Sequence, residues 1–441
     1  MKKYLLDCFI ATMFVFLTLV VIREVSELKV FNAFDPIGQS LGDMEMTDIT
    51  FSRMRNDPVI DTNIVIVNIG LLPRAGIAQQ IRIISHFKPK AIGIDSFFGC
   101  QYCPQGKIDS LCCPLAYDTL SNLAFGDAVR EAGNVVMVTK LLQTDSLLKV
   151  YNGDIDIYDS LEHSDMMLRQ NAREGYASLD TDAGHQEDLK SCRRFNPQVR
   201  VNDKYQLAFS TQLAMMYDSV RTKRFLARNK YSEVINYRGN IYDPFGASEY
   251  AGRYYTLDWD QALDSSSFVP SLFKDKIVLM GFLGNDLNDT SWDDKFFTPL
   301  NKNYAGKTRP DMYGVVVHAN AISMILNEDY IEELSETQQF LIAFVICFLN
   351  VALFFVINRK IPLWYDGLSL LLQLIQIIIC TIIMIYVFMW ANFKLNLTYT
   401  LAALALVGTC FELYENVFKR LFLSEKVKRL FTRKRKEVLT E

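Results

Sequence analysis

The sequence predicts an α/β protein with a mostly parallel sheet flanked by helices, together with four transmembrane α-helices, one N-terminal and three C-terminal. Two observations predict this combination. Apolar runs lie at residues 5–22 and, three times, between residues 340 and 413, and each is close to the roughly 20 residues that a helix needs to cross a bilayer. Between them, short runs of branched aliphatic residues alternate with segments of helical periodicity, which is the pattern of an α/β domain.

Basic residues beside the spans predict the orientation in the membrane. Lys2 and Lys3 precede the first span, and Arg359 and Lys360 lie between the second and third. Because short basic flanks stay cytoplasmic, we expect both termini in the cytoplasm and the large domain outside. The chain is then a multi-pass protein of a bacterial inner membrane with a periplasmic domain.

The first span, within residues 1–23, has two interpretations. A basic start followed by an apolar core is typical of a cleaved signal peptide. No small-x-small cleavage site follows this run, however, and the chain continues as Val21, Ile22, Arg23, Glu24. An uncleaved transmembrane signal anchor is the interpretation we prefer.

The elements of the outer domain, residues 24–335, can be predicted in order. Buried strands are expected at 63–68, 90–95 and 134–139, with helices at 75–87 and 123–132 between them. Strands joined by helices in this way run parallel. Four later elements are expected: a helix at 205–217, a short strand near Val234, a buried strand at 276–281 and a closing helix at 315–327.

Two polar segments differ from this pattern. Residues from about 141 to 201 are rich in Asp, Arg, Asn and Gly, which predicts an insertion of loops or short elements. This insertion is either a solvated decoration or a partner-binding surface. After the three C-terminal spans, 336–415, the basic tail 416–441 is expected in the cytoplasm against anionic membrane lipid. The formal net charge of −4 gives no indication of nucleic-acid binding.

Motifs along the outer domain carry a family resemblance. They occur in this order: Asp48 with Arg53, IVIVNIG at 64–70, Pro73 with Arg74, KAIGIDSFF at 90–98, KDKIVLMGFLG at 274–284, DKFFTPL at 294–300 and GVVVHANAI at 314–322. Together they resemble the CHASE2 family of extracytoplasmic sensory domains, whose usual arrangement is one transmembrane helix before the domain and three after it. The chain departs from the family at Asn68, Ile69 and Gly70, where acidic residues are usual, and it lacks the tryptophans expected before Arg74.

Polar residues near the predicted strand ends are candidates for a ligand site. In an open parallel sheet, ligands bind outside the carboxyl ends of the strands, and Asp95 lies at such an end. We expect Asp95, Asp294, His318 and Asn320 to line a polar crevice there. The alternative is structural: Asp95 caps the next element and His318 is a satisfied histidine at a helix start.

Cysteines give a second prediction. Five lie in the outer domain: Cys100, Cys103, Cys112, Cys113 and Cys192. An oxidising compartment favours disulfides, whereas a four-thiolate zinc site is the alternative, for which adjacent cysteines are awkward ligands. We expect at least one bridge involving the first four, with one thiol left over or paired between chains.

Polar residues also lie within the spans, at Asn350, Gln373 and Gln376. Gln373 and Gln376 share one helical face. Such groups seek partners in lipid, so they either pack the helices of one chain or form a seam with another copy or another membrane protein.

Catalytic signatures are missing from the sequence. It has no Walker loop, nucleophile elbow, HExxH or GxGxxG motif, so we expect neither an enzyme nor a bound cofactor or metal. The first functional hypothesis is a sensory subunit that passes a signal through its helices to a separate partner in the membrane or cytoplasm, because the chain ends soon after its last span. The second is a structural or assembly subunit of a bacterial envelope complex, with the outer domain as a docking platform. A homo-oligomer is compatible with both.

Overall fold

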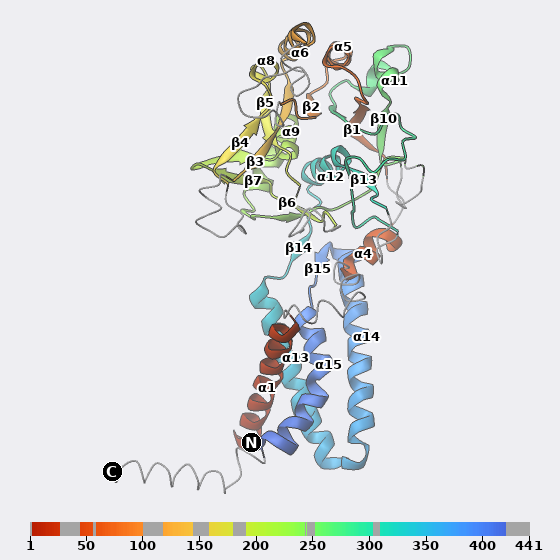
Figure 1. Ribbon diagram of the computed structural model, residues 1–441. Coiled ribbons are helices and arrows are strands. Elements are labelled where there is room, and N and C mark those ends of the chain that lie inside the picture. The colour runs from red at the N-terminus through yellow and green to blue at the C-terminus, as the bar shows by residue number, and fades with distance from the viewer. Residues whose placement is uncertain are drawn as a thin grey trace, which may run out of the picture. The chain divides into compact units, whose positions relative to one another are not determined.

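The computed structural model describes residues 2–26, 45–55, 59–99, 118–143, 158–179, 191–242, 244, 252–302 and 309–419. The chain forms two compact units (Figure 1). We call Asp43–Ile331 the outer unit, and Met1–Gly42 with Glu332–Glu441 the membrane unit. Each is described by itself.

A seven-stranded sheet forms the centre of the outer unit. Its order is β10-β1-β11-β2-β3-β4, and β5 also pairs with β3. The strands are β1 (Asp61–Asn68), β2 (Ala91–Asp95), β3 (Val135–Leu142), β4 (Ser160–His163), β5 (Arg173–Tyr176), β10 (Tyr254–Leu257) and β11 (Ile277–Gly281). Within this sheet only the β3–β4 pair is antiparallel, so the predicted mostly parallel sheet is confirmed.

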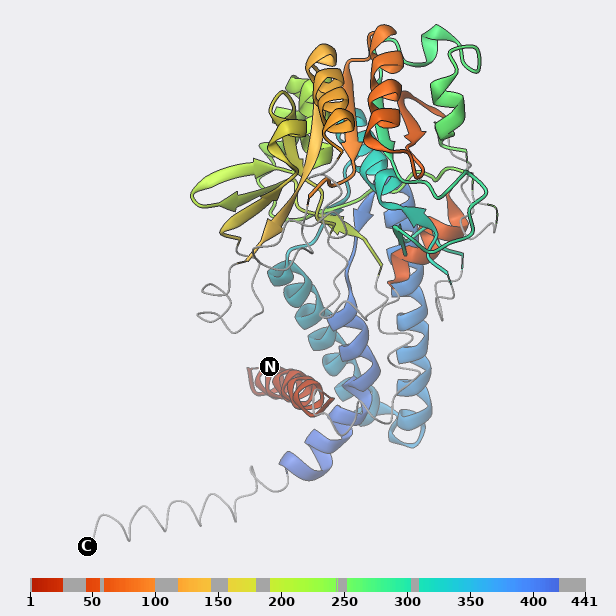
Figure 2. The same cartoon turned by 45° about the horizontal axis from the view of Figure 1, so that its top comes forward.

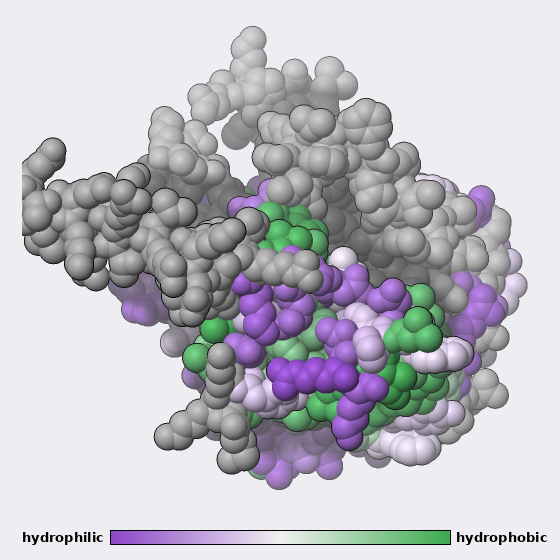
Figure 3. Space-filling view, turned by 90° about the horizontal axis from the view of Figure 1, so that it is seen from below, coloured by the Kyte–Doolittle hydropathy of each residue, from purple (hydrophilic) through white to green (hydrophobic). Residues whose placement is uncertain are grey.

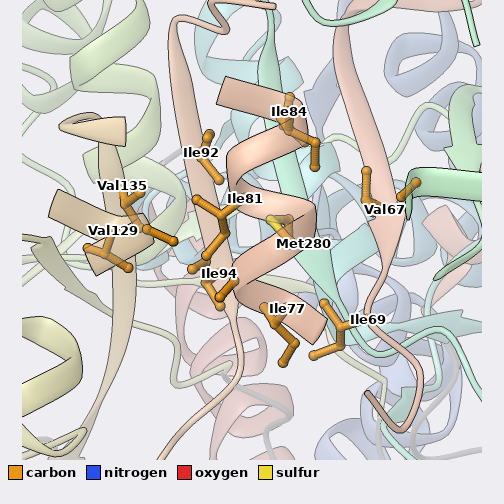
Figure 4. Close-up of a cluster of buried hydrophobic side chains, with 14 of the residues drawn as sticks. Val67, Ile69, Ile77, Ile81, Ile84, Ile92, Ile94, Val129, Val135 and Met280 are labelled. Atoms are coloured by element: carbon orange, nitrogen blue, oxygen red, sulfur yellow. The ribbon is translucent and has the colours of Figure 1, made fainter. Parts of the chain in front are cut away.

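Helices cover both faces of the sheet (Figure 2). On one face lie α5 (Arg74–His86) and α6 (Thr119–Ala132). The apolar side chains of α5 recur at Ile77, Ile81 and Ile84, so that one stripe packs onto the sheet. Figure 4 shows this stripe against side chains of β1, β2 and β11, including Ile92 and Met280.

The other face is covered by α9 (Phe209–Tyr217) and α12 (Gly314–Asn327). A Cβ at Gly93 of β2 would lie 2.6 Å from Leu213 and 2.8 Å from Phe209, so glycine lets α9 approach the sheet closely. Every residue of α12 from Gly314 to Leu326 is buried. Because this helix is buried all round, it behaves as a core element and not as an amphipathic surface helix.

The predicted polar insertion is only partly irregular. Besides β4 and β5 it contains α8 (Met166–Arg169), β6 (Arg194–Phe195) and β7 (Gln198–Val201). Two of its strands therefore extend the main sheet, which the polar composition did not indicate. The helix predicted from residue 205 begins instead at Phe209, because Lys204–Leu207 pairs with β7 as strand β8.

The remaining elements of the outer unit are short. They are α4 (Met46–Ile49), the π-helix η1 (Thr50–Met54), α10 (Ser219–Leu226), β9 (Glu233–Val234), α11 (Trp259–Leu263), the 3₁₀-helix η3 (Pro270–Leu272), β12 (Lys295–Phe296) and β13 (Met312–Tyr313). The strands β12 and β13 pair antiparallel immediately before α12.

The described part of the membrane unit contains four helices long and apolar enough to cross a membrane, as predicted. They are α1 (Lys2–Ser26), α13 (Glu336–Lys360), α14 (Tyr365–Ala391) and α15 (Thr398–Leu413), which continues as the π-helix η5 (Tyr414–Phe418). Helices α1, α13 and α15 share one apolar cluster, in which the rings of Phe355 and Phe411 meet edge to face at 4.7 Å. Short strands β14 (Glu332–Glu333) and β15 (Phe393–Lys394) pair in parallel, and a 3₁₀-turn, η4 (Pro362–Trp364), joins α13 to α14.

Two of the polar residues within the spans pack inside this chain. The amide of Gln373 donates to the carbonyl of Ser369 at 3.2 Å and occupies the place where a Cβ at Gly408 of α15 would lie. Asn350 is buried and donates to the carbonyl of Ile346 at 3.0 Å. Both contacts favour the single-chain interpretation for these residues.

Candidate functional site at the carboxyl edge of the sheet

Three strand ends lie side by side at the carboxyl edge of the sheet. The pairing register places Asn68 of β1 beside Gly281 of β11, and Gly281 beside Asp95 of β2. Alternate residues of these strands, such as Val67, Met280 and Ile94, belong to the core under α5. Because neighbouring residues of a strand point to opposite faces, Asn68, Gly281 and Asp95 face the side that α12 covers.

Asn68, at the end of β1, links this strand to the segments beside it through side-chain hydrogen bonds. Its amide donates to Asp258 Oδ1 at 2.8 Å and to the carbonyl of Gly284 at 3.1 Å. Its carbonyl oxygen accepts from the backbone N–H groups of Gly70 and Leu283 at 2.8 and 2.9 Å. The side chain is fully buried and uses all four of its hydrogen-bonding positions. At this position, where acidic residues are usual in the family that the sequence resembles, Asn68 therefore has a structural role and connects the end of β1 to the segments after β10 and β11.

Gly281 allows the first turn of α12 to rest on β11. A Cβ at this position would lie 2.8 Å from Cβ of Val315 and 2.9 Å from its Cγ2. At such distances a real side chain forces the helix or the strand to move. The start of α12 is therefore fixed against the centre of the edge.

Of the two predicted aspartates, Asp294 lies at this helix start, and the charge of Asp95 acts on it. The backbone carbonyl of Asp294 accepts from the N–H of Gly314 at 3.0 Å, and its carboxylate lies 3.5 Å from the position of a Cβ on Gly314. Burial raises the pKa of Asp95 to about 7. Burial, and then the nearby Asp95 carboxylate, raise the pKa of Asp294 to about 7. The structure therefore brings the charge of Asp95 to bear on Asp294, and burial raises the pKa of both carboxyl groups.

The other two predicted site residues lie deeper on α12. His318 is 3% exposed, its ring meets Phe209 edge to face at 5.2 Å, and its Nδ1 has no partner among the described residues. Burial lowers the pKa of His318 to about 4, so the ring is neutral at physiological pH. The structure places it in the packing layer between α12 and α9, one turn beyond the helix start.

Asn320 is committed to structure. Its amide donates to the carbonyls of Gly239 and Val316, both at 3.0 Å, and its oxygen accepts from the N–H of Arg238 at 3.0 Å. These bonds fix the segment 238–239 to α12. A role in ligand binding remains a prediction for both His318 and Asn320.

A small cavity next to the edge is lined by residues outside the four predicted ligand-site residues. Its lining includes Leu283, Asp289, Lys295, Asp311 and Tyr313, and its volume is about 10 Å³, which is room for about one water molecule. The ammonium of Lys295 lies 4.7 Å from the ring centre of Tyr313. This cavity is too small to hold a metabolite without opening.

Asp311 stabilises the wall of the cavity. Its carboxylate accepts from the N–H and hydroxyl of Thr298, at 2.8 and 2.6 Å, and from the amide of Asn301 at 3.1 Å. Burial raises the pKa of Asp311 to about 7. The family-like pair Thr298 and Pro299 is thus part of a buried turn.

No disulfide is seen among the described residues. Cys100, Cys103, Cys112 and Cys113 lie outside these residues, so their bridges stay a prediction. Cys192 is a thiol in this structure and is completely buried. Its thiol lies 3.8 Å from the carbonyl oxygen of Arg194. The disulfide prediction is not supported for this residue.

The comparison with protein families identifies the family of the chain. A family model described as CHASE2 domain matches residues 36–357, which is well over half of the chain. No curated protein and no solved structure matches the chain. The matched region begins after α1 and includes most of α13, and the described residues of this multi-pass membrane protein contain four candidate spans.

Proposed function

Because the chain belongs to the CHASE2 family, whose domain is an extracytoplasmic sensory domain and typically non-catalytic, we propose that it is a non-enzymatic sensory subunit. In this proposal the outer unit lies in the periplasm, both termini lie in the cytoplasm, and the helices span a bacterial inner membrane. A signal received at the carboxyl edge of the sheet passes through the helices to a separate protein partner.

The observation that carries the proposal is the position of α12. Its first turn lies on Gly281 and under Asp294, at the edge that holds the acidic pair. Its last residues precede α13 in the sequence, with only Glu328–Ser335 between them. A buried helix moves as a rigid rod, so a displacement at its start reaches its end.

The far end of α12 is held by arginines from the neighbouring segment. Arg221 donates to the carbonyl of Leu326 at 2.6 Å, Arg224 lies 2.9 Å from Glu328, and Arg238 lies 2.5 Å from Asp329. The guanidinium of Arg228 lies 4.5 Å from the ring centre of Tyr330. These contacts hold the end of α12 and the residues after it against the segment that supplies the arginines.

The N-terminal end of the outer unit is attached to the same region. Asp48 and Arg193 form a buried ion pair at 2.6 Å, with side-chain exposures of 4% and 5%. Arg55 donates to the carbonyl of Tyr237 at 2.6 Å, and Tyr237 donates to the carbonyl of Cys192 at 2.8 Å. Residues 48–55, which follow the first span, and residues 326–330, which precede the second, are therefore both bound to residues between Cys192 and Arg238.

Two experiments test this function. Protease added to intact spheroplasts should digest the outer unit, whereas digestion only after lysis would reverse the orientation. Purification of the full chain from native membranes should then capture a partner whose association changes with conditions outside, because a signal requires different affinity for two states of the sensor.

A second candidate function is a structural subunit of an envelope complex. Two observations favour it. The side chain of Asn68 is used for structural hydrogen bonds, and the cavity of about 10 Å³ is too small for a small-molecule ligand. A stable stoichiometric complex that is insensitive to outside conditions would support this candidate against the sensory one.

A further inference from the structure

The turn between α13 and α14 is an exposed apolar loop next to two cations. Arg359, Lys360 and the four residues after them are all exposed. Among these, Leu363 is 91% exposed, Trp364 is 69% exposed and Ile361 is 46% exposed. Water does not favour such a cluster, so another phase or molecule must cover it.

Helix length places this turn at the surface of the bilayer. Helix α13 has 25 residues, which corresponds to about 37 Å, whereas the hydrocarbon core is about 30 Å thick. The helix therefore reaches a few ångströms beyond the core, into the headgroup layer. Tryptophan and long basic side chains are the residues that prefer this layer.

The charges at this end of the bundle leave two cations available. Lys419 is neutralised by Asp7 at 3.4 Å and by Glu415 at 2.5 Å. Arg359 lies 5.5 Å from the ring centre of Tyr4, and neither it nor Lys360 forms an ion pair with a residue that the structure describes. In Figure 3, hydrophilic and hydrophobic side chains lie next to one another on the lower face of the molecule.

At the opposite end of the bundle, the loop between α14 and α15 has no exposed lysine or arginine. This loop contains one cation, Lys394, which is 9% exposed and lies 3.7 Å from Glu333. Glu332 and Glu336 add further negative charge there, although Trp390 is 77% exposed. One end of the bundle thus offers exposed cations beside an apolar turn, whereas the loop at the other end offers an exposed tryptophan near a lysine that pairs with Glu333.

We propose that the turn Arg359–Trp364 binds anionic phospholipid: Arg359 and Lys360 hold the headgroup phosphate while Ile361, Leu363 and Trp364 lie below it. The occupant is a lipid and not a protein because the turn ends a membrane-spanning helix and its charge is complementary to an anionic leaflet. This binding site is independent of the sensory function proposed above.

Selective quenching of single tryptophans tests the proposal. The full chain is placed in nanodiscs of phosphatidylcholine that contain the same small fraction of either brominated phosphatidylglycerol or brominated phosphatidylcholine. One variant carries W259F, W292F and W390F and reports Trp364. The matched variant carries W259F, W292F and W364F and reports Trp390.

Quenching of Trp364 should be several-fold stronger with the brominated anionic lipid, whereas Trp390 should not distinguish the two lipids. A basic residue near an anionic surface contributes about 1 kcal/mol, or about fivefold in partitioning. R359Q with K360Q should therefore bring the two quenching levels at Trp364 together. The same two substitutions are also made in the matched variant, where unchanged Trp390 emission shows that they leave the chain folded.

Three results would overturn the proposal. Equal quenching of Trp364 by both lipids means insertion without recognition of charge. A preference that survives R359Q with K360Q means that other groups hold the lipid. Emission typical of water with no quenching means that the turn lies outside the bilayer, where it would be free to bind a protein.

Discussion

Replacing Asp95 with asparagine should stabilise the outer unit at pH 8 and have little effect at pH 4. The pKa of Asp95 is raised to about 7 in the folded protein, whereas that of an unfolded aspartate is about 3.9. A raised carboxyl pKa contributes stability that is present below pH ~4 and is lost as the pH rises through about 7. Asparagine has nearly the same shape as aspartate but does not ionise, so the variant does not lose this stability as the pH rises.

The size of the effect follows from the shift. Three pKa units correspond to at most about 4 kcal/mol at 1.36 kcal/mol per unit. Asp95 is partly exposed, and solvent screens a group of this kind, so we expect about 1–2 kcal/mol of stabilisation at pH 8. Removing this charge also lowers the pKa of Asp294, which adds in the same direction.

The assay is urea unfolding of the full chain in detergent micelles at the two pH values. Trp259 is the reporter after the other three tryptophans are changed to phenylalanine, because its side chain lies against Gly70 and its indole N–H donates to the carbonyl of Asn285 at 3.1 Å.

Asp289 gives a control of opposite sign. The backbone N–H groups of Asn285 and Ser291 lower the pKa of Asp289, so this carboxylate contributes stability at neutral pH that is lost in acid. D289N should therefore destabilise the unit at pH 8. Equal effects of D95N at both pH values, or destabilisation at pH 8, would refute the reasoning about the acidic pair.

Three further predictions concern other parts of the chain. Arg193→Ala leaves Asp48 buried without its cation and should cost about 3–5 kcal/mol in urea unfolding, while R193M with D48L should cost much less; a loss below 1 kcal/mol in the single variant would contradict this. Gly408→Leu collides with Gln373 and should lower the melting temperature of the membrane unit by the equivalent of about 1–3 kcal/mol, with partial rescue by Gln373→Ala; no loss would mean that α14 does not pack there. Non-reducing peptide mapping should find at least one disulfide at Cys100, Cys103, Cys112 or Cys113, and four reduced, metal-bound thiols would reverse that expectation.

The regular part of the fold could be predicted from the sequence because its periodicities are strong. Strands buried on both faces, such as β1 and β11, are continuous aliphatic runs, and α5 has one clear apolar stripe. Strand β10 was missed because its Tyr254–Leu257 sequence is short and lies at the sheet edge. Strands β4 and β5 were missed because their pairing with β3 is set by tertiary contacts in a polar segment.

The candidate site was predicted only in part. A strand end is visible in a sequence, so Asp95 could be placed at the edge, and Asp294 was brought beside it by the β12–β13 pair before α12. The structural use of Asn320 depends on Gly239 and Arg238, which are far away in the sequence. The cavity residues Lys295 and Tyr313 carry no local signal, because only the pairing of their strands brings them together.

Hydrogen–deuterium exchange of the full chain decides whether α12 transmits displacement from the sheet edge to the first transmembrane turn after the outer unit. Gly281→Ala pushes against Val315, and we predict faster exchange at Leu326–Tyr330 and in the first turn of α13, with α5 and α6 unchanged. Val315→Ala in the same chain should restore slow exchange at both places. Faster exchange confined to β11 and the first turn of α12 would contradict a role for this helix as the relay.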